Sequence, residues 1–188
     1  MMMKKLWTIQ HRDAYQLLMK KGVLRANEQF LFCKDELRFA YDWMAKQMKI
    51  RIGSPTDSIK YPVWAWYQWE GQKTRRDLRF SGYAKRGTPM VQLEFEIDEK
   101  KILLSDFDDW HVVLNNTYLA DNKQDFDDFY ATSHKDRKHE IEISWNKIFE
   151  TEKYCPDWNT PLDSKSIQAT LWEINISQIK KVEFFIAK

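Results

Sequence analysis

The run YPVWAWYQW at residues 61–69 constrains the fold more than any other segment, because it predicts a strand that is apolar on both faces. Its alternating side chains are Val63, Ala65 and Tyr67 on one face and Trp64 and Trp66 on the other. A strand with two hydrophobic faces is stable in water where other elements cover both of them. We therefore expect this strand to lie inside a covered sheet.

The other segments predict a mixture of helices and strands without a regular βαβ rhythm. Apolar periodicity and end signals predict helices over residues 12–21, 34–50, 108–119 and 140–150. Strands are predicted over residues 5–9, 90–97 and 102–107, and in the closing runs QATLWEINI and KKVEFFIA. A polar segment at about 120–139 is predicted to form an exposed loop or a lid. We predict an α+β fold in one compact domain over residues 1–188, with a mixed or antiparallel sheet and helices.

The run MVQLEFEI at residues 90–97 alternates strictly between apolar and polar residues. This pattern predicts a strand with one buried face and one exposed face. The polar alternates Gln92, Glu94 and Glu96 are therefore expected to face solvent.

Cysteine usage and the N-terminal sequence indicate a cytoplasmic protein. The two cysteines, Cys33 and Cys155, form neither a disulfide framework nor a zinc-site spacing. No stretch approaches the roughly 20 apolar residues that cross a bilayer, so no membrane association is expected. The formal net charge of +2 is too small to imply nucleic acid by itself.

Aromatic residues are unusually abundant, with nine Trp, eight Tyr and eleven Phe. Such an excess indicates either a heavily aromatic core or a pocket lined with rings. Trp64 and Trp66 are candidates for stacking on a nucleobase, a nicotinamide or a sugar. The alternative is that these rings are core residues of a covered strand.

The familiar cofactor and metal motifs do not occur. The chain has no GxGxxG, GxxxxGK[ST], HExxH or GxSxG motif, so no phosphate cradle of backbone amides is expected. His134 and His139 are close in sequence, but a metal site needs more ligands than two. We expect no metal, and either metal-free chemistry or simple binding.

The segment LSDFDDWH at residues 104–111 places three acids at a strand-to-helix junction. Asp106, Asp109, Trp110 and His111 could therefore supply a carboxylate, a ring and an imidazole to a pocket, for acid–base chemistry or for holding a ribose hydroxyl. The alternative interpretation is an N-cap, because acids at the first turn satisfy free amides and suit the helix dipole.

A group of basic residues is interleaved with the aromatic residues Trp69, Phe80 and Tyr83. Its members are Lys46, Lys49, Arg51, Arg75, Arg76, Arg79, Lys85 and Arg86. Cations beside rings are typical of surfaces that bind phosphodiesters, although an ordinary solvated face has the same composition. Arg51 is singled out because it follows a buried helix face and precedes a glycine turn.

The chain resembles a family of uncharacterised bacterial proteins, one of the domains of unknown function. The motifs that carry this resemblance are LWTIQ, AYDWMAKQMKIRI, YPVWAWYQW, LLSDFDDWHVVLNN and QATLWEI, and they span nearly the whole chain. The spacing of the tryptophans makes the resemblance fairly specific, but it implies little about activity.

A looser resemblance is to the ADP-ribosyltransferase superfamily, on the segments LWTIQ…LLMKKGVL and ISQIKKV. It implies an NAD-dependent transferase that acts on nucleic acid or protein. Thr8, Gln10, Tyr41 and Trp66 would then line the nicotinamide site, Gln168 or Glu173 would hold the ribose, and Arg51 would pair with the pyrophosphate. The chain departs from that pattern, since Thr8 and Gln10 replace the usual Arg or His and the expected glutamate falls near Gln168.

Two other hypotheses stay open. In one, the chain is a binding module without chemistry, whose aromatic strand and basic loop at 72–87 bind a nucleic acid or a partner protein. In the other, the rings are core and the protein acts through an oligomer interface. Convergence of Thr8, Trp66, His111 and Gln168 on one cleft, with a small-molecule nucleotide as ligand, would favour the enzyme.

Overall fold

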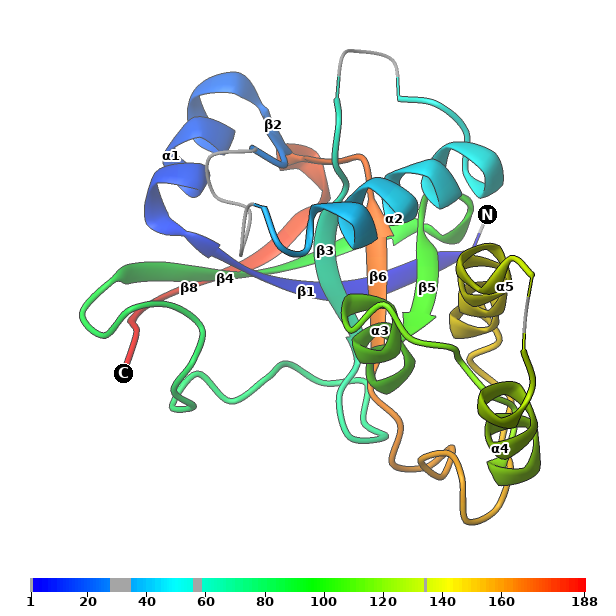
Figure 1. Ribbon diagram of the computed structural model, residues 1–188. Helices are drawn as coiled ribbons and strands as arrows, with labels where there is room; N and C mark the ends of the chain where they lie inside the picture. Colours follow the sequence, from blue (N-terminus) through cyan, green and yellow to red (C-terminus); the bar gives the residue numbers. More distant parts are fainter. Residues whose placement is uncertain (1, 28–34, 56–58, 134) are drawn as a thin grey trace.

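A six-stranded antiparallel sheet forms the centre of the computed structural model, in the order β5-β6-β3-β1-β4-β8 (Figure 1). Its strands are β1 (Met3–His11), β3 (Val63–Gln68), β4 (Pro89–Asp98), β5 (Leu103–Asp106), β6 (Ile167–Leu171) and β8 (Ile179–Ile186). A second, two-stranded sheet pairs β2 (Val23–Arg25) with β7 (Glu173–Asn175). The structure describes residues 2–27, 35–55, 59–133 and 135–188.

Five α-helices accompany the two sheets in the described ranges, which confirms the predicted α+β fold. They are α1 (Arg12–Lys21), α2 (Arg38–Arg51), α3 (Phe107–Leu114), α4 (Lys123–Ala131) and α5 (Arg137–Ser144). Single turns of 3₁₀-helix are η2 (Glu99–Lys101), η3 (Trp145–Phe149) and η4 (Ile176–Gln178). None of the helices in these ranges has the length and apolar character needed to cross a membrane.

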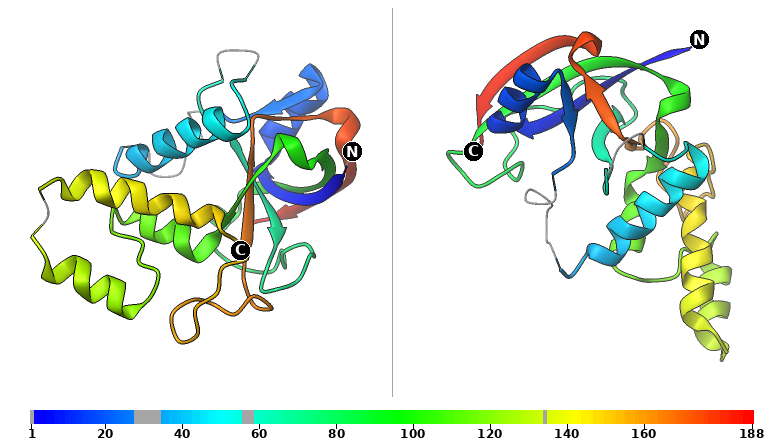
Figure 2. Two further views of the ribbon diagram at one scale, coloured as in Figure 1. Left: turned by 90° about the vertical axis from the view of Figure 1, so that its right-hand side faces the viewer. Right: turned by 90° about the horizontal axis from the view of Figure 1, so that it is seen from above.

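Strand β3 is covered on both faces, as its sequence predicts. Val63 and Ala65 belong to a hydrophobic cluster that includes Leu18 of α1 and the inner residues of β1, β4 and β6. Trp64, on the opposite face, packs against a second cluster that includes Trp110 of α3 and residues of α2 and η3. Figure 2 accordingly shows α2, α3 and α5 grouped at a distance from α1.

The sheet opens between β1 and β3. Strand β1 pairs with β4 along its whole length, from Met3 to His11, whereas its described register with β3 is the single pair Trp7 and Trp66. Figure 1 shows the consequence: β1, β4 and β8 run across the picture, and β3, β5 and β6 run steeply to them. The side chain of Thr8 joins the diverging strands by donating a hydrogen bond of 2.7 Å to the carbonyl oxygen of Trp64.

Residues 120–139 differ from the expected loop, because α4 and the start of α5 lie in this segment. Asn122 caps α4 by accepting a hydrogen bond from the amide of Asp125. Phe129 is buried and stacks on Tyr118 with ring centroids 3.9 Å apart. The aromatic residues of this helix supply an apolar face that the surrounding charges concealed in the sequence.

Strand β4 departs from the expected exposure at Gln92, which is buried. In the sheet, Gln92 lies opposite Glu183 of β8, and Arg75 of the β3–β4 connection forms an ion pair with Glu183. The connection therefore passes over this part of the polar face. The alternation of apolar and polar residues in β4 could not predict the burial of Gln92, because the residues that cover it belong to a segment outside the strand.

Candidate functional site

A cleft of about 1130 Å³ opens where β1 and β3 diverge. Its walls come from the end of β1, α1, β2, the first residues of β3 and the chain before it, α2, one side of α3, residues 82–84 of the β3–β4 connection, and Gln168 of β6. Ligand sites in proteins typically measure about 300–1,000 Å³, so the cleft has room for a ligand as large as a dinucleotide. Separation of β1 from β3 therefore creates the site.

Aromatic rings form the floor of the cleft. Trp64 and Trp110 lie with ring centroids 4.8 Å apart, and Tyr41 of α2 meets both of them edge-on. Trp66 meets Phe107 edge-on at 4.9 Å in a neighbouring group. Trp64, Trp66 and Tyr41 are half-buried, so part of each ring is open to a flat ligand, whereas Trp110 is buried.

Two polar atoms in this floor are buried without a partner among the described residues. They are the indole nitrogen Nε1 of Trp64 and the amide oxygen Oε1 of Gln168. The side chains come from adjacent strands, where Gln168 lies opposite Trp66 and Thr170 lies opposite Trp64. Buried polar atoms in proteins are nearly always paired, and each unpaired atom costs about 1–3 kcal/mol. The two side chains thus place one unpaired donor and one unpaired acceptor beside the cleft, and both atoms are closed to solvent in the unliganded protein.

The charged groups along the cleft are cationic. Lys21, Arg25 and Lys60 line it together with His11 and His111, and no Asp or Glu is among the described residues that line it. Arg25 also forms an ion pair with Glu173 at 2.9 Å. A concave site with this charge pattern favours an anionic ligand.

His111 has a defined orientation in the cleft wall. Its Nδ1 lies 2.9 Å from the carbonyl oxygen of Phe107, and its ring packs edge-on against the Phe107 ring. Because a carbonyl oxygen can only accept, Nδ1 carries the proton, and Nε2 of the neutral ring is an acceptor. A proton-accepting nitrogen is therefore held at an exposed position of the wall.

The fold brings together most of the side chains singled out in the sequence. Those that line the cleft are Gln10, Tyr41, Trp64, Trp66, Trp110, His111 and Gln168. Thr8 is buried beside them, where its hydroxyl accepts a hydrogen bond from Gln10 and donates one to Trp64. Thr8 therefore positions cleft residues without lining the cleft.

Other singled-out side chains lie elsewhere. Glu173 is in the small sheet, paired with Arg25, and does not line the cleft. Arg51 donates hydrogen bonds to Gln47 and Asn146, and its guanidinium lies 4.3 Å from the ring centroid of Phe149. These contacts direct Arg51 away from the cleft.

The acids of LSDFDDWH are also outside the cleft. Asp106 caps α3 through the amides of Asp108 and Asp109, and it forms a buried ion pair with Lys165 at 2.8 Å. The capping interpretation is confirmed for Asp106. Burial, followed by the charge of Asp106, raises the pKa of Asp109 to about 7.

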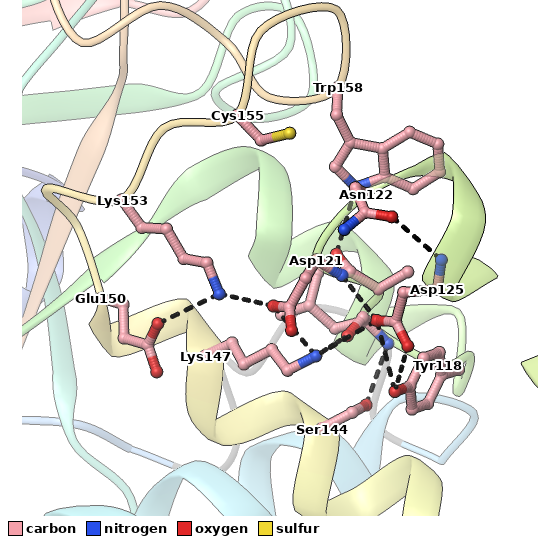
Figure 3. A network of polar contacts seen from close by, with 12 residues as sticks. Tyr118, Asp121, Asn122, Asp125, Ser144, Lys147, Glu150, Lys153, Cys155 and Trp158 are labelled. Carbon is pink, nitrogen blue, oxygen red and sulfur yellow. Dashed lines mark hydrogen bonds and ion pairs between the residues drawn. The ribbon is translucent and has the colours of Figure 1, made fainter.

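A separate polar network lies beside Asp109. Asp109 lines a small cavity together with Asp121, Lys147 and Lys153. Figure 3 shows Asp121 between the two lysines, with Lys147 also reaching Asp125. These ion pairs join the segment before α4 to η3 and the chain that follows it, so the network stabilises the fold.

Several cleft residues were missed in the sequence. Phe107 lies inside LSDFDDWH and could have been chosen from that motif. Lys21, Arg25 and Lys60 had no such signal, because they come from three separate segments that the fold brings to one cleft.

The family model for Domain of unknown function (DUF3841) matches residues 5–180, so the chain belongs to this family. No curated protein and no solved structure matches the chain. The match covers every strand of the cleft and both of the unpaired polar groups.

Proposed function

For this member of a family of unknown function, we propose that the cleft binds a nucleotide, NAD in particular, and that the domain is an ADP-ribosyltransferase-like enzyme. The observation that carries the proposal is the unpaired donor and acceptor of Trp64 and Gln168, set in an aromatic floor. Cationic walls without a carboxylate among the described lining residues support the same ligand class.

The floor suits the flat part of NAD. A nicotinamide carboxamide and a nucleobase each carry an N–H donor and a C=O or ring-nitrogen acceptor beside a planar ring. The N–H would donate to Oε1 of Gln168, and the acceptor would receive the Nε1–H of Trp64. The ring itself would stack on the indoles of the floor.

The walls suit the charged part of NAD. Lys21 and Lys60 would contact the pyrophosphate, since ammonium groups bind phosphate oxygens through charge-assisted hydrogen bonds. This assignment replaces the expected role of Arg51, whose guanidinium is committed to Gln47 and Asn146.

The transferase chemistry rests on the resemblance and on the strands that meet at the cleft. In ADP-ribosyl transfer, the bond between nicotinamide and the ribose carbon breaks, and the same carbon bonds to a nucleophile of the acceptor. The amide of Gln168 would hold a ribose hydroxyl, and Nε2 of His111 would take the proton of the nucleophile. Nicotinamide would leave the cleft.

Titration with NAD, followed by tryptophan fluorescence, tests the binding. We expect quenching, because three of the nine tryptophans line the cleft. Trp64→Phe keeps the ring but removes the donor, and should weaken NAD binding about fivefold to tenfold. The matched control is Trp158→Phe, because the Trp158 nitrogen donates to the Ala120 carbonyl outside the cleft.

Release of nicotinamide from NAD, measured by chromatography in the presence of an acceptor, tests the chemistry. His111→Gln and Gln168→Leu should abolish it. Fluorescence that stays unchanged up to millimolar NAD would overturn the binding proposal, and NAD binding without nicotinamide release would restrict the function to binding.

A further inference from the structure

Arg76 lies in the long connection from β3 to β4 and is stacked against aromatic rings. Its guanidinium carbon is 3.7 Å from the ring centroid of Trp69, 5.0 Å from that of Trp66 and 5.1 Å from that of Tyr83. Three rings thus hold one planar cation in place, which is typical of arginines that bind phosphate groups.

Arg76 forms no ion pair with a described residue, although the charge of Glu70 is near enough to act on its pKa. It makes no hydrogen bond to any of the described residues either, and its Nε is buried without a partner. Burial lowers the pKa of Arg76. A partly desolvated guanidinium that forms no direct ion pair and has an unpaired Nε favours an external anion.

The adjacent arginines differ from Arg76. Arg75 is paired with Glu183 at 2.9 Å, and Arg79 is paired with Asp77 at 2.6 Å. The three arginine side chains are chemically identical. Arg76 therefore differs from Arg75 and Arg79 only in its surroundings, which give it aromatic rings in place of a paired carboxylate.

The whole connection, residues 69–88, is basic and carries the exposed ring of Phe80. It holds six Lys and Arg against two Asp and Glu, whereas the chain as a whole has a net charge of +2. Lys73, Lys85 and Arg86 form no ion pair with any described residue, and Phe80 is 59% exposed. Cations spread along a loop match several phosphates of a strand better than one isolated phosphate.

We infer that the β3–β4 connection binds single-stranded nucleic acid, with a phosphate on Arg76 and a base on Phe80, and that this strand is the acceptor of the reaction. A single strand is favoured over a duplex because its bases are free to stack on exposed rings. Trp66 and Tyr83 touch Arg76 and also line the cleft, so the strand would pass its mouth. Its role as acceptor rests on the proposed function, but its binding does not.

Figure 1 shows the connection as a long segment that leaves the lower end of β3 and returns to the start of β4. It is anchored at its beginning, where the amide of Gly71 donates to the carbonyl of Lys165 and the amide of Glu70 donates to the Ser166 hydroxyl. These two hydrogen bonds fix the start of the connection, and with it the position of Arg76 and its aromatic rings next to the cleft.

Fluorescence anisotropy with a labelled single strand of about 12 nucleotides, without NAD, tests the inference. We expect binding that weakens linearly in a plot of log affinity against log salt. Arg76→Gln should weaken binding about fivefold to tenfold at low salt and reduce the slope by about 0.7, the value for one phosphate of a single strand. Arg79→Gln removes the same charge from the same loop, but it should leave affinity nearly unchanged because Arg79 is already paired.

Further variants and competing ligands make the outcome decisive. Phe80→Ala should weaken binding of the strand, and Arg76→Lys should restore it only in part, because lysine keeps the charge but loses the planar stack. Equal losses for Arg76→Gln and Arg79→Gln would overturn the inference, as would equal binding of a duplex or of polyglutamate. Circular dichroism of each variant would show that the fold is retained.

The two proposals fail independently. Trp64→Phe and Gln168→Leu should weaken NAD binding and leave oligonucleotide binding unchanged, whereas Arg76→Gln should weaken oligonucleotide binding and leave NAD binding unchanged. Loss of NAD binding with intact strand binding would leave the inferred surface in place and remove only its role as acceptor.

Discussion

At the residue scale, the candidate site is defined by polar atoms that the folded chain leaves unpaired. Trp64 and Gln168 were both candidates from sequence, but so were Glu173 and Arg51, and no pattern separated the two groups. The structure separates them by partners: Glu173 and Arg51 have theirs, whereas Nε1 of Trp64 and Oε1 of Gln168 have none among the described residues. Unpaired buried groups lower stability, and the proposed function is built on the two that belong to cleft residues.

Gln168→Leu is predicted to increase the stability of the unliganded protein while it removes ligand binding. Leucine has a similar size and leaves no unpaired acceptor, so the free energy of unfolding should rise by about 1 kcal/mol. Urea unfolding measures this change. Gln68→Leu is the matched control, because the Gln68 amide donates to the Lys165 carbonyl at 3.0 Å and its loss should destabilise the fold. A loss of stability in Gln168→Leu would show that its amide is paired in solution.

Asp109 is predicted to make stability depend on pH. Its folded pKa of about 7 lies above that of an unfolded aspartate, so the folded state holds the proton more tightly. Stability should therefore fall as the pH rises from about 4 to 7, and level off above the folded pKa.

Asp109→Asn should remove most of this dependence and stabilise the protein by about 2–4 kcal/mol at pH 8. Asp108→Asn is the control, since the Asp108 carboxylate is in an exposed contact with Thr160. Urea unfolding of both variants at pH 5 and pH 8 measures the effect. A wild-type protein with equal stability at the two pH values would contradict the prediction.

At the element scale, most helices and strands followed from periodicity, and their connections did not. Helix α1 begins and ends where its terminal residues predicted, with Gly22 in the left-handed conformation after its last turn. Helix α4 was missed because acidic residues conceal its aromatic face. Burial of Gln92 was missed because a separate connection covers it. Local patterns report on a strand or helix, but they do not report on what packs against it.

Gly71 is predicted to be essential for the anchoring of the β3–β4 connection. Its φ is 76°, and an added Cβ would lie 1.6 Å from the backbone oxygen of Asp163. Gly71→Ala should therefore cost more than about 3 kcal/mol, because backbone must move in addition to the strain of positive φ. Gly82→Ala is the control: its φ is 99°, but nothing described lies within 4 Å of the added carbon. In thermal unfolding, the melting temperature of Gly71→Ala should be clearly lower than that of Gly82→Ala. Equal melting temperatures would contradict the steric argument.

At the scale of the whole molecule, the sheet order brings together segments from both ends of the chain. Strand β3 separates β1 from β6, so Gln10 near the start and Gln168 near the end face one cleft. Helices α2 and α3 close that cleft from the opposite face of the sheet, and the β3–β4 connection passes its mouth. The site therefore depends on the complete fold.

The sequence by itself determined the α+β class, the double cover of β3 and most of the elements, because periodicity and end signals are local properties of the chain. It also supplied seven of the side chains that line the cleft. Only the tertiary structure decided where β1 leaves β3, which buried atoms remain unpaired, and which arginine is stacked among three rings. Those features depend on distances between residues far apart in sequence, and such distances are set by packing.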